Sequence, residues 1–105
     1  MPNVTKHYQN RQANYTDRFE FEFRWEPSKG FYTVWCIHHP PDPQQKGHEI
    51  HHLGKDGMLC QRQGYESRTF EHAEAYALWW AERWSIYVRT GEFPMTRGKV
   101  RVPDR

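Results

Sequence analysis

The chain has 105 residues and a net charge of +2, which leaves room for one domain and does not by itself indicate nucleic-acid binding. Aromatic residues make up 16% of it, so a few large rings can build the core. No apolar run approaches the roughly 20 residues that span a bilayer, and the N-terminal residues lack the apolar stretch of a signal peptide. We therefore expect a cytoplasmic protein in which Cys36 and Cys60 stay reduced.

Residues 1–17 are polar and lack any periodicity, which predicts a flexible arm. Over residues 18–26, aromatic and charged residues alternate without a fault, and this predicts a strand with one buried face. A turn over residues 27–30 follows, with proline and glycine in positions that favour it, and leads to a second strand over 31–39. The two strands are expected to form a hairpin.

The second strand is apolar on both faces. One face carries Phe31, Thr33, Trp35 and Ile37, and the other carries Tyr32, Val34, Cys36 and His38. Only one set can lie in the core, and the sequence does not decide which. The other face must be covered by the arm, paired across a dimer or exposed to a ligand.

Residues 43–54 permit two interpretations. One is a strand over 47–53, a turn at 54–57 with the Asp-Gly pair typical of hairpins, and a strand over 58–63. The other is a short helix that begins after Asp42 and stops at Gly54. We favour the hairpin, because Gly47 would lie inside the helix and few apolar residues would face inward.

Residues 69–89 form the one long amphipathic segment, which predicts a helix with Thr69 as its N-cap and Gly91 as its stop. Helix and strands together predict an α+β fold in which an antiparallel sheet of three or four strands packs on one long C-terminal helix, in a single domain over residues 18–94. Residues 95–105 are expected to be a flexible basic tail. The predicted core is Phe19, Phe21, Phe23, Trp25, Ala73, Tyr76, Ala77, Trp80, Trp84 and Tyr87.

One motif suggests an enzyme. His48, Glu49 and His52 satisfy H-E-x-x-H, which on a helix places two imidazoles on one face to bind zinc beside a general base. The motif resembles that of the thermolysin-like zinc peptidases, and the resemblance implies Glu49 as the base and Glu71 or Glu74 as a third ligand. Because we read this segment as a strand or loop, a zinc-dependent hydrolase is an alternative here and a solvated histidine-rich segment is the simpler interpretation.

The function that the sequence favours is a small, non-catalytic binding domain. Trp and Arg together are typical of interaction surfaces, and such residues occur on the strands, before the helix and on its shoulder. A protein partner or self-association is preferred, because the net charge is small and glutamates interleave the arginines. A nucleic-acid-binding domain that uses the sheet face and the basic tails is the first alternative. The candidate binding residues are Trp35, Arg24, Arg62, Arg68, Trp79 and Arg83.

Overall fold

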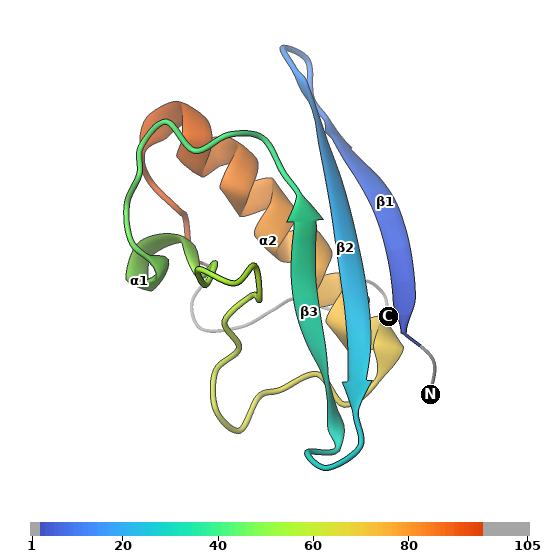
Figure 1. Ribbon diagram of the computed structural model, residues 1–105. Coiled ribbons are helices and arrows are strands. Elements are labelled where there is room, and N and C mark those ends of the chain that lie inside the picture. The colour runs from blue at the N-terminus through green and yellow to red at the C-terminus, as the bar shows by residue number, and fades with distance from the viewer. Residues whose placement is uncertain (1–2, 96–105) are drawn as a thin grey trace.

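The structure is a computed structural model that describes residues 3–95, and it contains one three-stranded antiparallel sheet packed on a long helix (Figure 1). The strand order in the sheet is β1-β2-β3, and α2 lies across one face. This confirms the predicted α+β fold with two layers. Apart from Met95, the predicted basic tail lies outside the described residues. The elements are β1 (Val4–Arg11), β2 (Thr16–Glu26), β3 (Phe31–His38), α1 (His48–His51) and α2 (Phe70–Thr90).

Strand β1 shows that the prediction of a flexible arm over residues 1–17 is wrong. It pairs with β2 along its whole length, from Val4 opposite Phe23 to Arg11 opposite Thr16. Two of its side chains contact α2: Tyr8 donates a hydrogen bond to the carboxylate of Glu74, and Lys6 lies 3.6 Å from the same carboxylate. An edge strand that is held mainly by backbone pairing needs no alternation of apolar and polar residues, and this is why the sequence pattern did not reveal it.

The pairing of β2 with β3 decides which face of β3 is buried. Phe21 pairs with Cys36, Phe23 with Val34 and Trp25 with Tyr32, so the face of β3 that carries Tyr32, Val34 and Cys36 joins the core. The face that carries Phe31, Thr33, Trp35 and Ile37 therefore lies on the outer side of the sheet. The register shifts beside Phe21, which brings His38 opposite Glu20.

The predicted strands over 47–53 and 58–63 do not form. Instead, one helical turn forms at α1, and only the turn at 54–57 is as expected, closed by a hydrogen bond of 2.9 Å from Gly54 N to the Met58 carbonyl. The chain then touches the edge of β3 at two points. Leu59 N donates to the carbonyl of Val34 at 2.8 Å, and Tyr32 N donates to that of Ser67 at 2.7 Å. These isolated contacts cover the β3 edge without a regular fourth strand.

The connection from β3 to α2 is held by ring donors of the helix. Figure 1 shows this connection and α1 along the side of α2 that faces away from β1. Irregular backbone has carbonyl groups with no regular partner, and burial of such groups is unfavourable unless a donor reaches them. The donors are Tyr76 to the Cys60 carbonyl, Trp80 to the His51 carbonyl at 2.8 Å, Trp84 to the Pro40 carbonyl at 3.0 Å, and Tyr87 to the Asp42 carboxylate at 3.1 Å.

Trp80 lies at the centre of the core. Its ring meets those of Phe19 and Phe21 edge-on, with centroids 6.1 Å and 5.9 Å away, and it stacks on Trp84 at 5.0 Å. The predicted core residues are buried, with the exception of Trp25, which is only half-buried near the hairpin turn. The helix boundaries also agree with the prediction, because the Thr69 hydroxyl accepts the His72 N–H at 3.1 Å and Gly91 adopts a left-handed φ of 84°.

Replacement of Trp80 by alanine should lower the free energy of unfolding by about 3–5 kcal/mol, because it opens a large cavity in a closed core. Trp80 is fully buried, whereas Ile86 on the same helix is 38% exposed. Ile86→Ala is therefore the matched control and should cost less than about 1 kcal/mol. Urea unfolding of both variants measures the difference, and equal stabilities would show that the wrong helix face has been assigned to the core.

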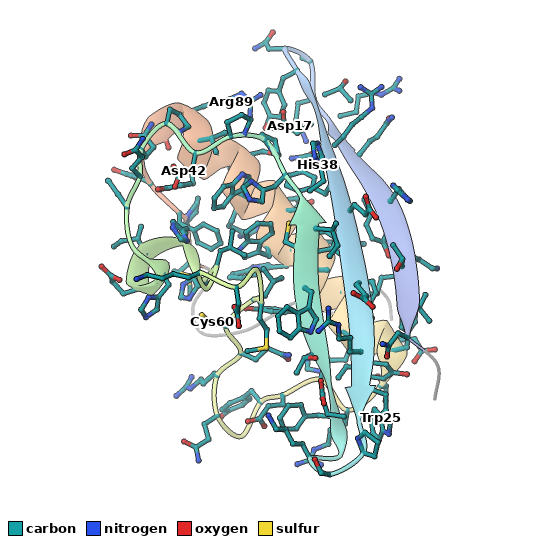
Figure 2. All side chains as sticks on the ribbon, in the orientation of Figure 1. Asp17, Trp25, His38, Asp42, Cys60 and Arg89 are labelled. Carbon is teal, nitrogen blue, oxygen red and sulfur yellow. The ribbon has the colours of Figure 1, made fainter. Side chains whose placement is uncertain are left out.

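An ion pair between buried Asp17 and the more exposed Arg89 joins the start of β2 to the end of α2 (Figure 2). The Arg89 guanidinium donates to both carboxylate oxygens of Asp17, at 2.6 Å and 3.0 Å, and lies 3.5 Å from the centre of the Tyr15 ring. Burial by itself would raise the pKa of Asp17, but the hydrogen bonds from Arg89 more than offset this and hold the pKa below its usual value.

Because the pKa of Asp17 is lower in the folded than in the unfolded chain, the pair stabilises the protein above the unfolded value of about 3.9 and is lost as pH falls through the folded value. We expect Asp17→Asn to lose about 1–2 kcal/mol at pH 7, a discounted figure because the Arg89 side chain is 38% exposed.

Chemical unfolding of wild type and Asp17→Asn at neutral pH and near pH 3 tests this expectation. The stability gap between them should narrow in acid, whereas Glu92→Gln, which alters an exposed carboxylate, should track the wild type. A gap that stays constant across this pH range would show that the Asp17 charge does not contribute.

Candidate functional site

The structure does not bring together the ligands of the alternative zinc site. Helix α1 is a single turn, and His52 lies just beyond it with a left-handed φ of 62°, so the two imidazoles of the motif do not share a helix face. The His48 side chain is 69% exposed, and Glu74 instead accepts a hydrogen bond from Tyr8. Within residues 3–95, no group of three or more His, Cys, Asp or Glu side chains lies close enough to hold a metal ion.

His51, which lies between His48 and His52 in the sequence, is the histidine of this segment that stabilises the fold. Its Nε2 is 2.7 Å from the carbonyl of Lys46, and its Nδ1 accepts the N–H of Leu53 at 3.2 Å. A neutral ring with the proton on Nε2 satisfies both contacts. The ring is buried between Trp84 and Tyr87, at centroid distances of 5.3 Å and 5.4 Å. The sequence has three histidines within residues 48–52, and nothing in it distinguishes His51 as the one that is buried.

The titratable groups nearby are not tuned for nucleophilic chemistry. Burial raises the pKa of the Cys36 thiol to about 12, and burial together with the Asp56 carboxylate raises the pKa of Cys60. Thiols with raised pKa values are weak nucleophiles near pH 7 because they remain protonated. Burial, followed by the charges of His51 and His48, lowers the pKa of His52 and favours its neutral ring.

Histidine-to-alanine variants distinguish a structural role of these side chains from a role in metal binding. His51→Ala should lower the free energy of unfolding by about 2–3 kcal/mol, because it removes two hydrogen bonds and ring packing from a buried site. His48→Ala should change it by less than about 0.5 kcal/mol, since the side chain is exposed. The measurement is thermal unfolding of wild type, His48→Ala, His51→Ala and His52→Ala, each with and without zinc. A zinc-induced stabilisation that both His48→Ala and His52→Ala abolish would restore the metal site.

The outer face of the sheet carries a network of side-chain contacts, and Trp35 lies at the centre of this network. The guanidinium of Arg24 lies 4.0 Å from the centre of the Trp35 ring and pairs with Glu22 at 3.0 Å. The indole N–H donates to the Thr33 hydroxyl at 2.9 Å, which in turn donates to the carboxylate of Glu26 at 2.9 Å. The indole ring of Trp35 and the guanidinium of Arg24 are therefore both held in place by neighbouring side chains.

An apolar stripe runs along β3 on this outer face, and charges of both signs lie beside it. Phe31 and Trp35 are half-buried, and Ile37 is 53% exposed. The described elements all lie on the other face of the sheet or at its edges, so this stripe faces outward (Figure 1). By register, the outer face of β1 and β2 carries three arginines and three glutamates, namely Arg11, Arg18, Arg24, Glu20, Glu22 and Glu26.

A hollow of about 540 Å³ lies beside His38, whose place at the end of β3 is labelled in Figure 2. The register of the sheet places His7, Glu20 and His38 in one row across its three strands. This row adds polar hydrogen-bonding groups to the end of the apolar stripe. The other residues that line the hollow are Tyr8, Gln9, Arg18 and Phe19.

The six predicted binding residues fall in three places. Trp35 and Arg24 form the centre of the outer face. Arg62 and Arg68 lie on the loop that contacts the β3 edge through Ser67. Trp79 and Arg83 lie together on α2, with the Arg83 guanidinium 5.0 Å from the indole ring, but Trp79 is partly covered because Phe93 packs on it at 5.8 Å and Tyr76 stacks on it at 5.9 Å.

In comparisons with protein families, with curated proteins and with solved structures, no match to this chain was found. The arguments about function consequently start from the geometry alone. The part of the chain described here contains no helix of the length and apolar character required to cross a bilayer.

Proposed function

We propose that the protein is a non-catalytic protein-binding domain whose contact surface is the outer face of the sheet. The observation that carries this proposal is the Trp35–Arg24 pair, at 4.0 Å, on a sheet face that bears exposed Ile37 and that the described elements leave uncovered. Tryptophan and arginine are the residues most enriched among those that dominate binding energy, and apolar neighbours exclude water around them.

The contacts that hold Trp35 and Arg24 in place make this surface suitable for association. Binding costs conformational entropy wherever a long side chain must be immobilised. Here Arg24 is already held between the indole ring and Glu22, and the indole is held by Thr33. Little of that cost therefore remains when a partner approaches the centre of the face.

The partner that the surface fits best is a second copy of the chain. A two-fold interface brings one patch against itself, so a patch of a single charge would repel its copy. The outer face instead carries arginines and glutamates in equal number, which can pair across a two-fold axis while the β3 stripes meet at its centre. The same balance disfavours a phosphate backbone as the partner of this face.

Sedimentation equilibrium over a range of protein concentrations tests the proposed dimer. We expect wild type to form a dimer in the micromolar range, Trp35→Ala to raise the dissociation constant at least about tenfold, and Ile37→Glu to give a monomer. Ile86→Glu makes the same change at a 38% exposed position of α2 and should leave the dimer intact. Circular dichroism of each variant shows that it is folded.

Two results would contradict the proposed dimer. A wild-type protein that stays monomeric up to about 100 μM, or a dimer that Ile86→Glu disrupts and Ile37→Glu does not, would rule out this face as the site of self-association.

A further inference from the structure

The two edges of the sheet differ in whether the described chain covers them. The edge on β3 is covered by the connection to α2, since Cys36 N donates to the Gly57 carbonyl at 2.8 Å and Leu59 N to the Val34 carbonyl at 2.8 Å. Strand β1 is the outermost strand on the other side (Figure 1). Within residues 3–95, no backbone hydrogen bond reaches its outer edge.

The turn between β1 and β2 determines which residues of β1 point to that open edge. Gln12 N donates to the Tyr15 carbonyl at 2.8 Å, so these residues form the first hydrogen-bonded pair beside the turn. Such pairs alternate along an antiparallel ladder with pairs that are not bonded to each other. The register continues without a shift to Val4 opposite Phe23, so the even-numbered residues of β1 bond to β2. The backbone N–H and C=O groups of the odd-numbered residues therefore point to the open edge. These exposed residues are Thr5, His7, Gln9 and Arg11.

Strand β1 lacks the features that usually prevent an edge strand from pairing. Proteins protect such edges by short strands, prolines, bulges or a lysine whose charge a new strand would bury. Strand β1 is eight residues long, contains no proline and pairs with β2 without a bulge. The ammonium group of Lys6 already lies 3.6 Å from the Glu74 carboxylate and 5.3 Å from the centre of the Phe70 ring. An added strand would consequently not leave this charge without a partner.

We infer that the outer edge of β1 binds an extended segment of another protein, which adds a fourth strand antiparallel to β1. The edge offers a backbone donor and an acceptor at every second residue. An extended backbone matches this spacing, whereas a helix uses its own backbone groups internally. Main-chain hydrogen bonds supply the affinity in this mode of recognition, and antiparallel pairing is the more stable arrangement. The edge is separate from the outer face and does not depend on self-association.

The side chains beside the edge indicate what kind of segment fits. Residues of the segment that bond to β1 would carry their side chains on the outer face, beside the polar odd-numbered residues. The intervening residues would lie on the helix side, where Val4 and Tyr8 are half-buried. We therefore expect polar residues to alternate with β-branched apolar residues in the segment. A second copy of β1 matches this pattern less well, because it carries Lys6 and Asn10 at helix-side positions.

An NMR titration of the full chain with the substitution Ile37→Glu tests the inference, because this change removes the proposed outer-face contact. The probe is a capped synthetic peptide of about eight residues, in which threonine alternates with valine between two terminal glutamates. We expect a dissociation constant on the order of 0.1–1 mM. The amide signals of the odd-numbered residues of β1 should shift most, since their N–H groups gain new partners.

Two methylated forms of the peptide show whether backbone bonds hold it. N-methylation of the threonines removes the donors that face β1 and should weaken binding at least about tenfold. The same number of N-methyl groups on the valines, whose N–H groups face away from β1, should change the affinity by less than about threefold. Both forms have the same composition and charge.

A pair of substitutions at Gln9 makes the same test on the protein. Gln9→Pro removes one N–H group from the open edge and should weaken binding about tenfold. A proline is tolerated there because this N–H group does not bond to β2. Gln9→Ala keeps the N–H group and should bind within about twofold of the unchanged chain. Circular dichroism shows that both variants are folded, and the methylated peptides give the test without either variant.

Three outcomes would overturn the inference. The first is the absence of shifts in β1 at peptide concentrations up to about 5 mM. The second is equal weakening by the two methylated peptides, which would show that the backbone does not hold the segment. The third is a dimer of the Ile37→Glu protein that Gln9→Pro dissociates, which would assign the edge to a second copy. The outer-face dimer is measured separately, in protein that retains Ile37.

Discussion

The structure depends on Trp80, because this one side chain holds both sides of the helix. Its ring meets Phe19 and Phe21 of the sheet, while its N–H donates to the backbone carbonyl of His51 in the connection on the other side. An indole is suited to this position, since it combines a large apolar surface with one polar atom. The neighbouring rings of Tyr76, Trp84 and Tyr87 repeat the same device, so that one helix face supports a regular sheet and an irregular loop together.

The location of the candidate function follows from this arrangement. Helix α2 is engaged by the sheet on one side and by the 40–60 connection on the other, and no further described element is left to cover the outer face of the sheet. A protein with a single long helix can bury only one side of its sheet. Apolar residues on the remaining side are not required for the fold, and the proposed contact with another molecule is therefore argued from Trp35 and Ile37 on that side.

Arginine–aromatic pairs occur both on the outer face of the sheet and on the loop that contacts the β3 edge. On the outer face, Arg24 is neutralised by Glu22, and its guanidinium serves to hold the ring of Trp35. On the loop before α2, the Arg62 guanidinium lies 4.9 Å from the centre of the exposed Tyr65 ring.

The sequence by itself determined the elements whose signals are local. The capping of α2 by Thr69 and Gly91, the alternation of β2 and the turn before β3 depend on neighbouring residues only, and they were predicted correctly. The tertiary structure decided the rest. β1 forms because β2 offers it an edge, the outer placement of Trp35 follows from the register of β3 on β2, and His51 becomes an anchor because Trp84 and Tyr87 enclose it. These features depend on contacts between residues far apart in the chain, and such contacts leave no periodic pattern in the sequence.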